Sequence, residues 1–130
     1  MPLKIHIKKG QQVIINGAVL ENAGPKTVSL VVKNDAAILR DSDIVSPNDA
    51  STPASRTYYA LQCVYLFPDK RDHYLQVFNE LSDSFARAVP SSGDIVTSAQ
   101  KLVEAGQYYN ALKKAQELIV HEGKVLSRVE

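Results

Sequence analysis

The period of the apolar residues changes once along this chain, and this change restricts the possible folds more than any other feature. In residues 3–8 apolar residues occupy every second position, which is typical of a half-buried strand, and short apolar runs separated by turn residues continue to about residue 40. From residue 53 onward they recur at every third or fourth position, the spacing of one face of a helix. Strands followed by helices predict an α+β fold. A small N-terminal antiparallel β-sheet should precede a C-terminal bundle of about four helices that ends in an antiparallel helical hairpin.

The N-terminal part contains a strong hairpin signal. Asn16-Gly17 separates the apolar runs 13–15 and 18–20, and an Asn-Gly pair readily takes the positive φ angles of a type I′ turn. Further strands are predicted over residues 28–32 and 37–39. The residues of the first strand that are expected to face the core are Leu3, Ile5 and Ile7.

A polar segment separates the strands from the helices. Residues 41–52 are polar and irregular, so we predict that they link a basic antiparallel sheet in residues 1–40 to a helical part in residues 53–130. Thr52 is expected to be the N-cap of the first helix and Pro53 its first residue, because a threonine hydroxyl can bond first-turn N–H groups and proline needs no N–H partner there. We expect the three parts to form a single compact protein.

The helical part is divided at Pro68, Pro90 and Gly106. Asp69 and the pair Ser91-Ser92 stand where their side chains can cap the following helices. Gly106 is predicted to end the third helix in a left-handed conformation. Because the turn around Gly106 is short, the last two helices are expected to lie antiparallel against each other.

The composition is that of an ordinary globular protein. Hydrophobic residues make up 45% of the 130 residues, and no apolar run approaches the ~20 residues of a membrane span. The N-terminus lacks the apolar core of a signal peptide. Cys63 is the single cysteine and cannot form an internal disulfide, which suits a reducing compartment. We therefore expect a cytoplasmic protein that does not associate with membranes.

The sequence contains no arrangement of residues that is typical of a catalytic or metal site. The three histidines are scattered, without a metal-ligand spacing. The six glycines form neither a phosphate loop nor a dinucleotide motif. Cys63 lies inside a predicted helix beside Val64 and is expected to be a buried, unreactive thiol. The sequence therefore predicts a protein that is not an enzyme and uses no cofactor or metal.

The N-terminal third is locally basic, although the whole chain carries a formal charge of only +1. Residues 1–34 hold five lysines against one glutamate, a net charge of +4, and the rest of the chain carries −3. Alternation in the first strand places a row of basic side chains on one face. Such a face can neutralise RNA phosphates, or its lysines can guard a strand against edge-to-edge aggregation. The candidate RNA-binding residues are Lys4, His6, Lys8, Lys9, Lys26 and Lys33.

The basic face has no aromatic platform beside it. Residues 1–57 contain no Phe, Tyr or Trp, so any RNA contact would use phosphates, backbone groups and base edges rather than base stacking. With a net charge of only +1, strong RNA binding would require a homo-oligomer that combines two basic faces, or a protein partner.

Two adjacent tyrosine pairs, Tyr58-Tyr59 and Tyr108-Tyr109, fall in the predicted helices. Neighbouring residues on a helix lie about 100° apart, so one member of each pair is turned away from the face of the other. Tyr59 and Tyr109 are the candidates for exposed side chains that contact a protein partner, and Tyr108 is expected to be buried. The small residues of the last hairpin resemble half of a tetratricopeptide motif. They either pack the core of the hairpin or form a groove for a partner.

Several short motifs occur in order over nearly the whole chain. They are Met1-Pro2-Leu3-Lys4, Ile14-Ile15-Asn16-Gly17-Ala18-Val19, Ala37-Ile38-Leu39-Arg40, Thr52-Pro53-Ala54, Tyr58-Tyr59-Ala60-Leu61-Gln62, Pro90-Ser91-Ser92 and Ala111-Leu112-Lys113 after Tyr108-Tyr109. Together they resemble the FlbT family of bacterial flagellum biosynthesis regulators. The resemblance implies a regulator that binds the 5′ untranslated region of flagellin mRNA, promotes its degradation and represses flagellin synthesis. It also implies a protein partner, FlaF, and it assigns no catalytic residues.

Two functions therefore stay open. The first is an RNA-binding post-transcriptional regulator that reads the flagellin mRNA leader through the N-terminal sheet. The second is a protein-interaction adaptor or flagellin-directed chaperone that works through the helical half, with indirect effects on mRNA. The clustered lysines favour the first function, and the extent of amphipathic helix favours the second. Some members of the family act as activators, so the resemblance leaves the sign of regulation open.

Overall fold

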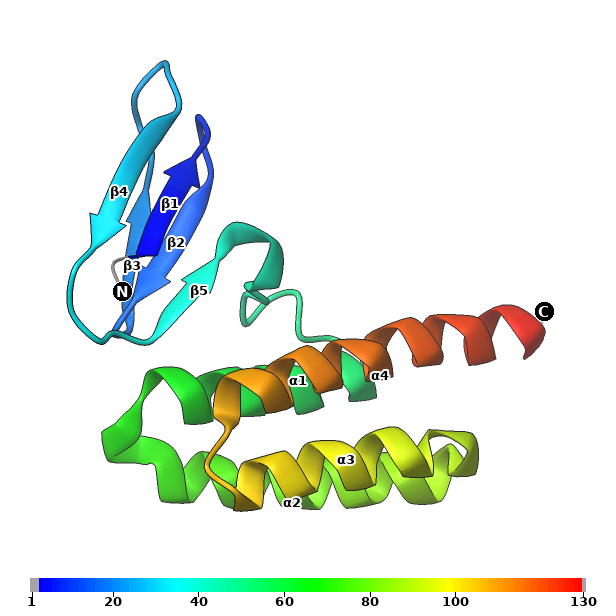
Figure 1. Cartoon of the computed structure of the whole chain (residues 1–130). Helices are drawn as coiled ribbons and strands as arrows, with labels where there is room; N and C mark the ends of the chain where they lie inside the picture. Colours follow the sequence, from blue (N-terminus) through cyan, green and yellow to red (C-terminus); the bar gives the residue numbers. More distant parts are fainter. Residues whose placement is uncertain (1–2, 130) are drawn as a thin grey trace. The chain divides into compact units, whose positions relative to one another are not determined.

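The computed structural model describes residues 3–129, apart from the side chains of residues 128 and 129. Strands come first along the chain and helices follow (Figure 1), so the predicted α+β class is confirmed. Internal contacts divide the chain into two compact units, residues 1–44 and residues 45–130. We call them the β unit and the helical unit.

Within the described residues the β unit has five short strands in two antiparallel sheets. In one sheet β1 (Leu3–Ile7) pairs with β4 (Val28–Val32). In the other, β2 (Gln12–Ile15) lies between β3 (Ala18–Glu21) and β5 (Ile38–Arg40). Every pairing is antiparallel, as predicted.

The β2–β3 hairpin turns at Asn16-Gly17, as predicted. Asn16 has a φ angle of 50° and Gly17 one of 85°, and Ile15 pairs with Ala18 across the turn. Two consecutive positive φ angles are characteristic of a type I′ turn, whose twist matches that of the strands. The Asn16 side chain also accepts a hydrogen bond from the Ala37 backbone N–H (2.9 Å), which ties the turn to the residue before β5.

The core of the β unit is small. Ile5, Ile7 and Val13 form a buried cluster, and half-buried side chains from both sheets pack against them. Ile14 and Leu39 are buried as well. On β1 the buried isoleucines alternate with exposed polar residues, as predicted. The prediction that Leu3 faces the core is wrong, since this side chain is 42% exposed. Leu3 lies at the end of the β1–β4 ladder, and the buried cluster does not extend that far.

A buried asparagine ties the end of β1 to the connection between β3 and β4. The Asn22 Nδ2 group donates to the carbonyl oxygens of Ile7 (2.8 Å) and Lys26 (2.8 Å). Its Oδ1 accepts from the Gly24 backbone N–H (3.0 Å). Buried polar groups are stable only when such bonds are made. This side chain therefore fixes the part of the β unit in which three of the candidate lysines lie.

The helical unit contains the four predicted helices within the described residues. They are α1 (Pro53–Leu66), α2 (Arg71–Ala88), α3 (Gly93–Glu104) and α4 (Tyr108–Val129). Helix α1 packs against α2 and α4, while α3 packs against α4 and runs antiparallel to it, as predicted (Figure 1). The largest fully buried side chains of this unit include Tyr58, Leu61, Phe78, Leu112 and Leu118.

The predicted start of α1 is confirmed. The Thr52 hydroxyl accepts a hydrogen bond from the Ser55 backbone N–H (3.2 Å), and the Ser55 hydroxyl accepts one from the Thr52 backbone N–H (2.9 Å). This reciprocal pair is a capping box. The segment before it belongs to the same unit, because the Gln62 side chain of α1 bonds both backbone groups of Val45 (2.9 and 3.0 Å). Closer to the strands, the short 3-10 helix η1 (Asp41–Asp43) follows β5 within the β unit.

The predicted caps of α2 and α3 are wrong. Neither Asp69 nor Ser91-Ser92 caps a helix with its side chain. Two short 3-10 helices, η2 (Pro68–Lys70) and η3 (Pro90–Ser92), continue directly into α2 and α3. The carbonyl oxygens of Pro68 and Pro90 accept from the backbone N–H groups that begin the following helices. These bonds take the place of side-chain caps.

Helix α3 ends before Gly106, as predicted. Gly106 has a φ angle of 75°, and its N–H donates to the Val103 carbonyl oxygen (3.0 Å). The next N–H, of Gln107, donates to the Leu102 carbonyl oxygen (2.9 Å). These two bonds form a Schellman motif. A Cβ atom added to Gly106 would meet no atom within 4 Å, so the backbone conformation alone favours glycine at this position.

Candidate nucleic-acid interface

The exposed face of the β1–β4 ladder carries two of the basic candidates. Lys4 pairs with Val31, and His6 pairs with Ser29. Directly paired residues of an antiparallel ladder point to the same face, and all four side chains are exposed. A hydrogen bond of 2.8 Å joins His6 Nδ1 to the Ser29 hydroxyl. It holds the imidazole ring against the neighbouring strand.

The remaining candidates lie at the two ends of this ladder. Lys8 and Lys9 follow β1, and Lys26 precedes β4. Because the last residue of β1 pairs with the first residue of β4, these three lysines gather at one end. Lys33 follows β4 and lies at the opposite end of the ladder. The strand β4 between the two ends is about 13 Å long, given a rise of about 3.3 Å per residue. We call the six residues the lysine face: Lys4, His6, Lys8, Lys9, Lys26 and Lys33.

The charges of the lysine face are not neutralised by the fold. All six side chains are exposed, and within residues 3–129 no ion pair or side-chain hydrogen bond holds any of the five ammonium groups. The β unit contains six basic and four acidic residues, a net charge of +2, whereas the helical unit carries −1. Exposed cations of this kind can bind the phosphates of a nucleic acid.

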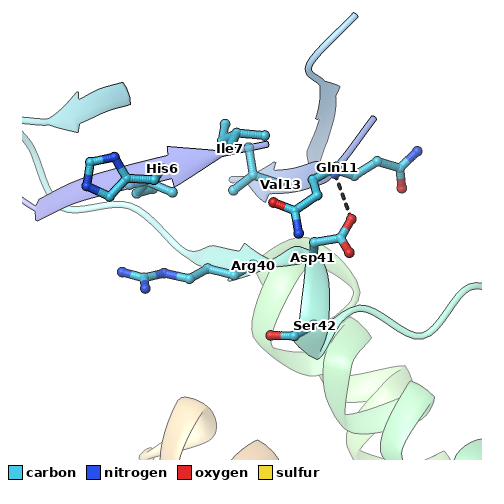
Figure 2. A pocket seen from close by; sticks show the side chains of 9 residues that line it. His6, Ile7, Gln11, Val13, Arg40, Asp41 and Ser42 are labelled. Atoms are coloured by element: carbon cyan, nitrogen blue, oxygen red, sulfur yellow. Dashed lines mark hydrogen bonds between the residues drawn. The ribbon is translucent and has the colours of Figure 1, made fainter. Parts of the chain in front are cut away.

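A small polar hollow in the β unit includes residues that the sequence reasoning missed. It has a volume of about 180 Å³ and is lined by residues 5–7, 11–13 and 40–42 (Figure 2). The pairing of Val13 with Arg40 brings the third of these segments beside the second. The Asp41 Oδ1 atom accepts a hydrogen bond from the Gln12 backbone N–H (2.7 Å). Arg40 is exposed and, in the part of the chain that the structure describes, forms no ion pair or hydrogen bond through its side chain.

The two tyrosines proposed for partner contact lie in different surroundings. Tyr109 on α4 is 40% exposed, with its ring centroid 5.8 Å from that of Tyr65 and with the Lys113 Nζ atom 5.4 Å from its ring centroid. Tyr59 on α1 is only partly exposed. Burial, then the neighbouring Cys63, raises the pKa of Tyr59 to about 12. Among the described residues the ring of Tyr109 contacts that of Tyr65 and not that of Tyr59.

Tyr108 is less buried than predicted. Its side chain is half-buried, and the Arg71 guanidinium lies 4.6 Å from its ring centroid. Tyr108 is the first residue of α4. The buried residues Ala111, Leu112 and Ala115 come later along the helix, and at its start the Arg71 side chain lies over the Tyr108 ring instead. The predicted helical phase nevertheless holds, because Tyr109 is the more exposed of the pair.

Cys63 is a buried thiol, as predicted. It is 1% exposed, and burial raises its pKa although hydrogen bonds with Tyr59 and Tyr74 oppose that effect. A thiol that keeps its proton is a poor nucleophile. Among the described residues there is also no group of three or more His, Cys, Asp or Glu side chains that could hold a metal ion. In the same residues no helix is both long enough and apolar enough to cross a membrane.

The helical unit has an apolar groove of about 540 Å³. It is bounded by the start of α1, the last turns of α2 and the last turns of α4. Glu122, a polar residue that lines the groove, is engaged within the fold: its Oε2 atom accepts a hydrogen bond from the Ala54 backbone N–H (3.0 Å) at the start of α1. The apolar lining residues are Pro53, Leu81, Phe85, Ala88, Val89, Val125 and Leu126.

Comparisons with known proteins gave matches that include residues of both units. The sequence model of the family "Flagellar protein FlbT" matches residues 3–126. The probable flagellum biosynthesis repressor protein FlbT 1 of Bradyrhizobium diazoefficiens is 34% identical over 130 residues, covering 100% of this chain and 88% of that protein. No solved structure matches the chain.

Two further relatives agree with this match. The probable flagellum biosynthesis repressor protein FlbT of Rhodopseudomonas palustris is 34% identical over 131 residues, covering 98% of this chain and 100% of the relative. The flagellum biosynthesis repressor protein FlbT of Caulobacter vibrioides is 33% identical over 131 residues, covering 99% of this chain and 92% of the relative. The match extends across strands and helices alike, and it confirms the resemblance that the ordered motifs indicated. The chain belongs to the FlbT family of flagellar proteins.

Proposed function

We propose that this protein represses flagellin synthesis after transcription. In this proposal it binds the 5′ untranslated region of flagellin mRNA in the cytoplasm and promotes degradation of that mRNA. Relatives that match nearly its whole length are called flagellum biosynthesis repressors, which supports the repressor role. The observation that carries the RNA-binding step is the lysine face, whose five ammonium groups have no partner in the described residues.

The lysine face suits the backbone of an RNA strand. Each lysine that binds a phosphate of a single strand releases a counterion, so affinity falls with salt, with a slope of about 0.7 per contact. Three lysines gather at one end of the β1–β4 ladder, Lys4 lies on its exposed face and Lys33 lies at the far end, so they meet different phosphates. A homo-oligomer would combine two such faces and increase the number of contacts.

The protein binds the mRNA in this proposal and does not cleave it, and a separate nuclease degrades the transcript. We therefore expect the purified protein to leave flagellin leader RNA intact on a denaturing gel. Cleavage that persists through further purification and disappears with one point substitution would contradict this part of the proposal.

The direct test is the affinity for a flagellin leader RNA, measured by fluorescence anisotropy at several salt concentrations. Replacing Lys4, Lys8 and Lys9 together by glutamate should abolish binding, because three attractive contacts become repulsive. The variant should melt like the wild type, since these side chains are exposed and form no ion pair or side-chain hydrogen bond within residues 3–129.

A matched control keeps the charge change and moves it to the other unit. It replaces three exposed lysines of the helical unit by glutamate, Lys70, Lys101 and Lys124. This control has the same net charge as the first variant and should still bind the leader RNA. If the first variant folds and binds like the wild type, the lysine face is not the RNA site.

The second candidate function is that of an adaptor or flagellin-directed chaperone acting through the helical unit. The apolar groove and the exposed Tyr109 ring favour it, because a groove of this kind can hold the apolar face of a partner helix. FlaF is the partner that the family resemblance implies. Repeating the anisotropy measurement with and without FlaF separates the two functions. If RNA binding requires FlaF and is unchanged by the lysine substitutions, the adaptor function is favoured.

A further inference from the structure

The hollow of the β unit follows the edge of β1 that has no strand partner. Three consecutive residues of β1, 5–7, line it, although side chains along a strand point alternately to opposite faces. A hollow that is lined by all three residues must therefore run along the backbone edge of the strand. In the described residues β1 pairs only with β4, so its other edge has no strand partner. The volume of about 180 Å³ equals that of about six water molecules at about 30 Å³ each. Such a space suits one small planar group rather than a ligand that needs about 300–1,000 Å³.

The side chains around the hollow combine a free donor with a free acceptor. The Arg40 guanidinium has no partner in the described residues, and Figure 2 shows it extending to the same side of the hollow as His6. Asp41 uses its Oδ1 atom for the Gln12 backbone N–H (2.7 Å), which leaves Oδ2 to accept from a ligand. Gln11 uses its Oε1 atom for the Lys8 backbone N–H (3.0 Å), which leaves its amide N–H groups to donate.

This combination matches the edge of a nucleic-acid base better than it matches a phosphate. A phosphate in the hollow would be repelled by the Asp41 carboxylate, whereas a base edge presents donors and acceptors side by side. Among the bases, guanine offers the acceptors O6 and N7, which an arginine contacts through two parallel hydrogen bonds. Guanine also has N–H donors on its Watson–Crick edge, and a carboxylate can accept hydrogen bonds from them when the base is unpaired.

The hollow adjoins the end of the lysine face where three lysines gather. The Gln11 backbone N–H donates to the Lys8 carbonyl oxygen (3.0 Å), so one tight turn joins this lysine to the lining of the hollow. An RNA strand whose phosphates lie on Lys8 and Lys9 therefore passes beside the hollow. One of its bases can enter while the backbone stays on the lysines.

We propose that this hollow binds one unpaired guanine base of the RNA, with Arg40 donating to the acceptors of the base and Asp41 accepting from its N–H groups. The proposal rests on the RNA-binding function proposed above. It adds a base preference to that function, because contacts to phosphates position a strand without reading its sequence.

The test compares two labelled single-stranded RNA oligomers of about twelve nucleotides, a length in the range that single-strand sites cover. One contains uridine only, and the other has a single guanosine at its centre. The wild-type protein should bind the guanosine oligomer about tenfold more tightly, a typical discrimination for a bidentate contact. Asp41→Asn keeps the Oδ1 acceptor for Gln12 but loses the charged acceptor, so it should bind both oligomers equally.

Two further variants make the result specific. Arg40→Lys keeps the positive charge and loses the planar fork of donors, so it should bind the uridine oligomer like the wild type and lose the preference for guanosine. Asp35→Asn is the matched control, because Asp35 is an exposed acidic residue of the same unit that does not line the hollow. This control should keep the full preference. Thermal melting of each variant checks that it folds.

The outcomes separate this proposal from the function on which it rests. If the wild type binds the leader RNA but binds both oligomers equally, the guanine site is wrong and RNA binding stands. If the preference persists in folded Asp41→Asn and Arg40→Lys, guanine is recognised elsewhere and the assignment of the hollow is wrong. If neither the leader RNA nor the oligomers bind, both proposals fail.

Discussion

The two units of this protein differ in how their charges are distributed. In both units polar side chains bond backbone groups and hold the fold in place, as Gln62 and Glu122 do in the helical unit and Asn22 does in the β unit. The β unit in addition carries Arg40 and the five lysines of the lysine face, which have no side-chain partner among the described residues, and its net charge is +2 against −1 for the helical unit. Charges that the fold does not use can bind a ligand at little cost to stability. We therefore expect ligand binding mainly in the β unit.

The cores of the two units differ as well, in the size of the side chains that they bury. The buried cluster of the β unit consists of Ile5, Ile7 and Val13, and apolar side chains such as Val19 (60%) and Val31 (53%) stay exposed. A unit of this size cannot cover both faces of every strand. The largest fully buried side chains of the β unit are Leu39 and Val13, whereas the helical unit also buries whole aromatic rings, among them Phe78 at 0% exposure. We therefore expect substitutions in the two units to change stability and RNA affinity separately.

The largest expected effect is on the stability of the helical unit. Phe78→Ala should lower the free energy of unfolding by about 3–5 kcal/mol, because it leaves a cavity in a closed core. Urea denaturation followed by helical circular dichroism measures this loss. Val120→Ala is the control and should change stability by less than about 0.5 kcal/mol, since Val120 is 58% exposed. RNA affinity of the folded Phe78→Ala protein should equal that of the wild type. A parallel loss of affinity would contradict the division of roles between the units.

Gly106→Val should have a smaller effect on the same unit. The substitution should lower the free energy of unfolding by about 1–2 kcal/mol, because a β-branched residue is strained at positive φ. The cost comes from the backbone conformation, since among the described residues no atom lies within 4 Å of the added Cβ position. Gly106→Asn should cost less, because asparagine tolerates this conformation. Equal losses for valine and asparagine would show that something other than backbone conformation decides this position.

The adjacent tyrosines of α4 should separate stability from partner binding. Tyr108→Ala should lower the free energy of unfolding by about 1–2 kcal/mol, because it removes a half-buried ring and its contact with Arg71. Tyr109→Ala should cost less than about 1 kcal/mol, since this ring is the more exposed of the two and loses mainly its contacts with Tyr65 and Lys113. If a protein partner such as FlaF docks on this face, Tyr109→Ala should weaken its binding, as measured by calorimetric titration. A larger loss of stability for Tyr109→Ala than for Tyr108→Ala would reverse this assignment.

Local signals in the sequence predict most of the elements, and they do not predict the hollow. The Asn16-Gly17 turn, the capping box at Thr52 and the end of α3 at Gly106 each depend on a few neighbouring residues, and all three are confirmed. The starts of α2 and α3 are not predicted correctly, because the 3-10 helices that begin at Pro68 and Pro90 replace side-chain caps.

The place of Arg40 beside the hollow could not be predicted from a local sequence pattern. It lies outside the basic N-terminal third, and only the pairing of β5 with β2 brings it beside residues 11–13. The sequence indicates the strands without fixing which of them pair, so a site made by three separate segments stays hidden. The lysine face was predictable because it depends mainly on the alternation within β1 and on turns next to it.

The smallest expected effect is a change of stability with alkaline pH that is confined to the helical unit. Burial first, with Cys63 and Tyr74 adding to it, raises the pKa of Tyr59 to about 12, whereas an unfolded chain has a tyrosine pKa of about 10. Below pH 10 or so both states carry the proton, and the free energy of unfolding does not depend on this group. Between about pH 10 and 12 the unfolded state loses the proton first, so stability falls as pH rises.

Tyr59→Phe should make that decline shallower, because the substituted ring does not titrate. The decline should not disappear, since burial raises the pKa of Cys63, and the Cys63 charge together with burial raises that of Tyr74. Urea denaturation at several pH values, followed by helical circular dichroism, measures the slope. Residues 1–44 contain neither tyrosine nor cysteine, so these groups titrate only in the helical unit. If Tyr59→Phe and the wild type lose stability with the same slope, the Tyr59 hydroxyl titrates alike in the folded and unfolded states, and its burial does not matter for stability.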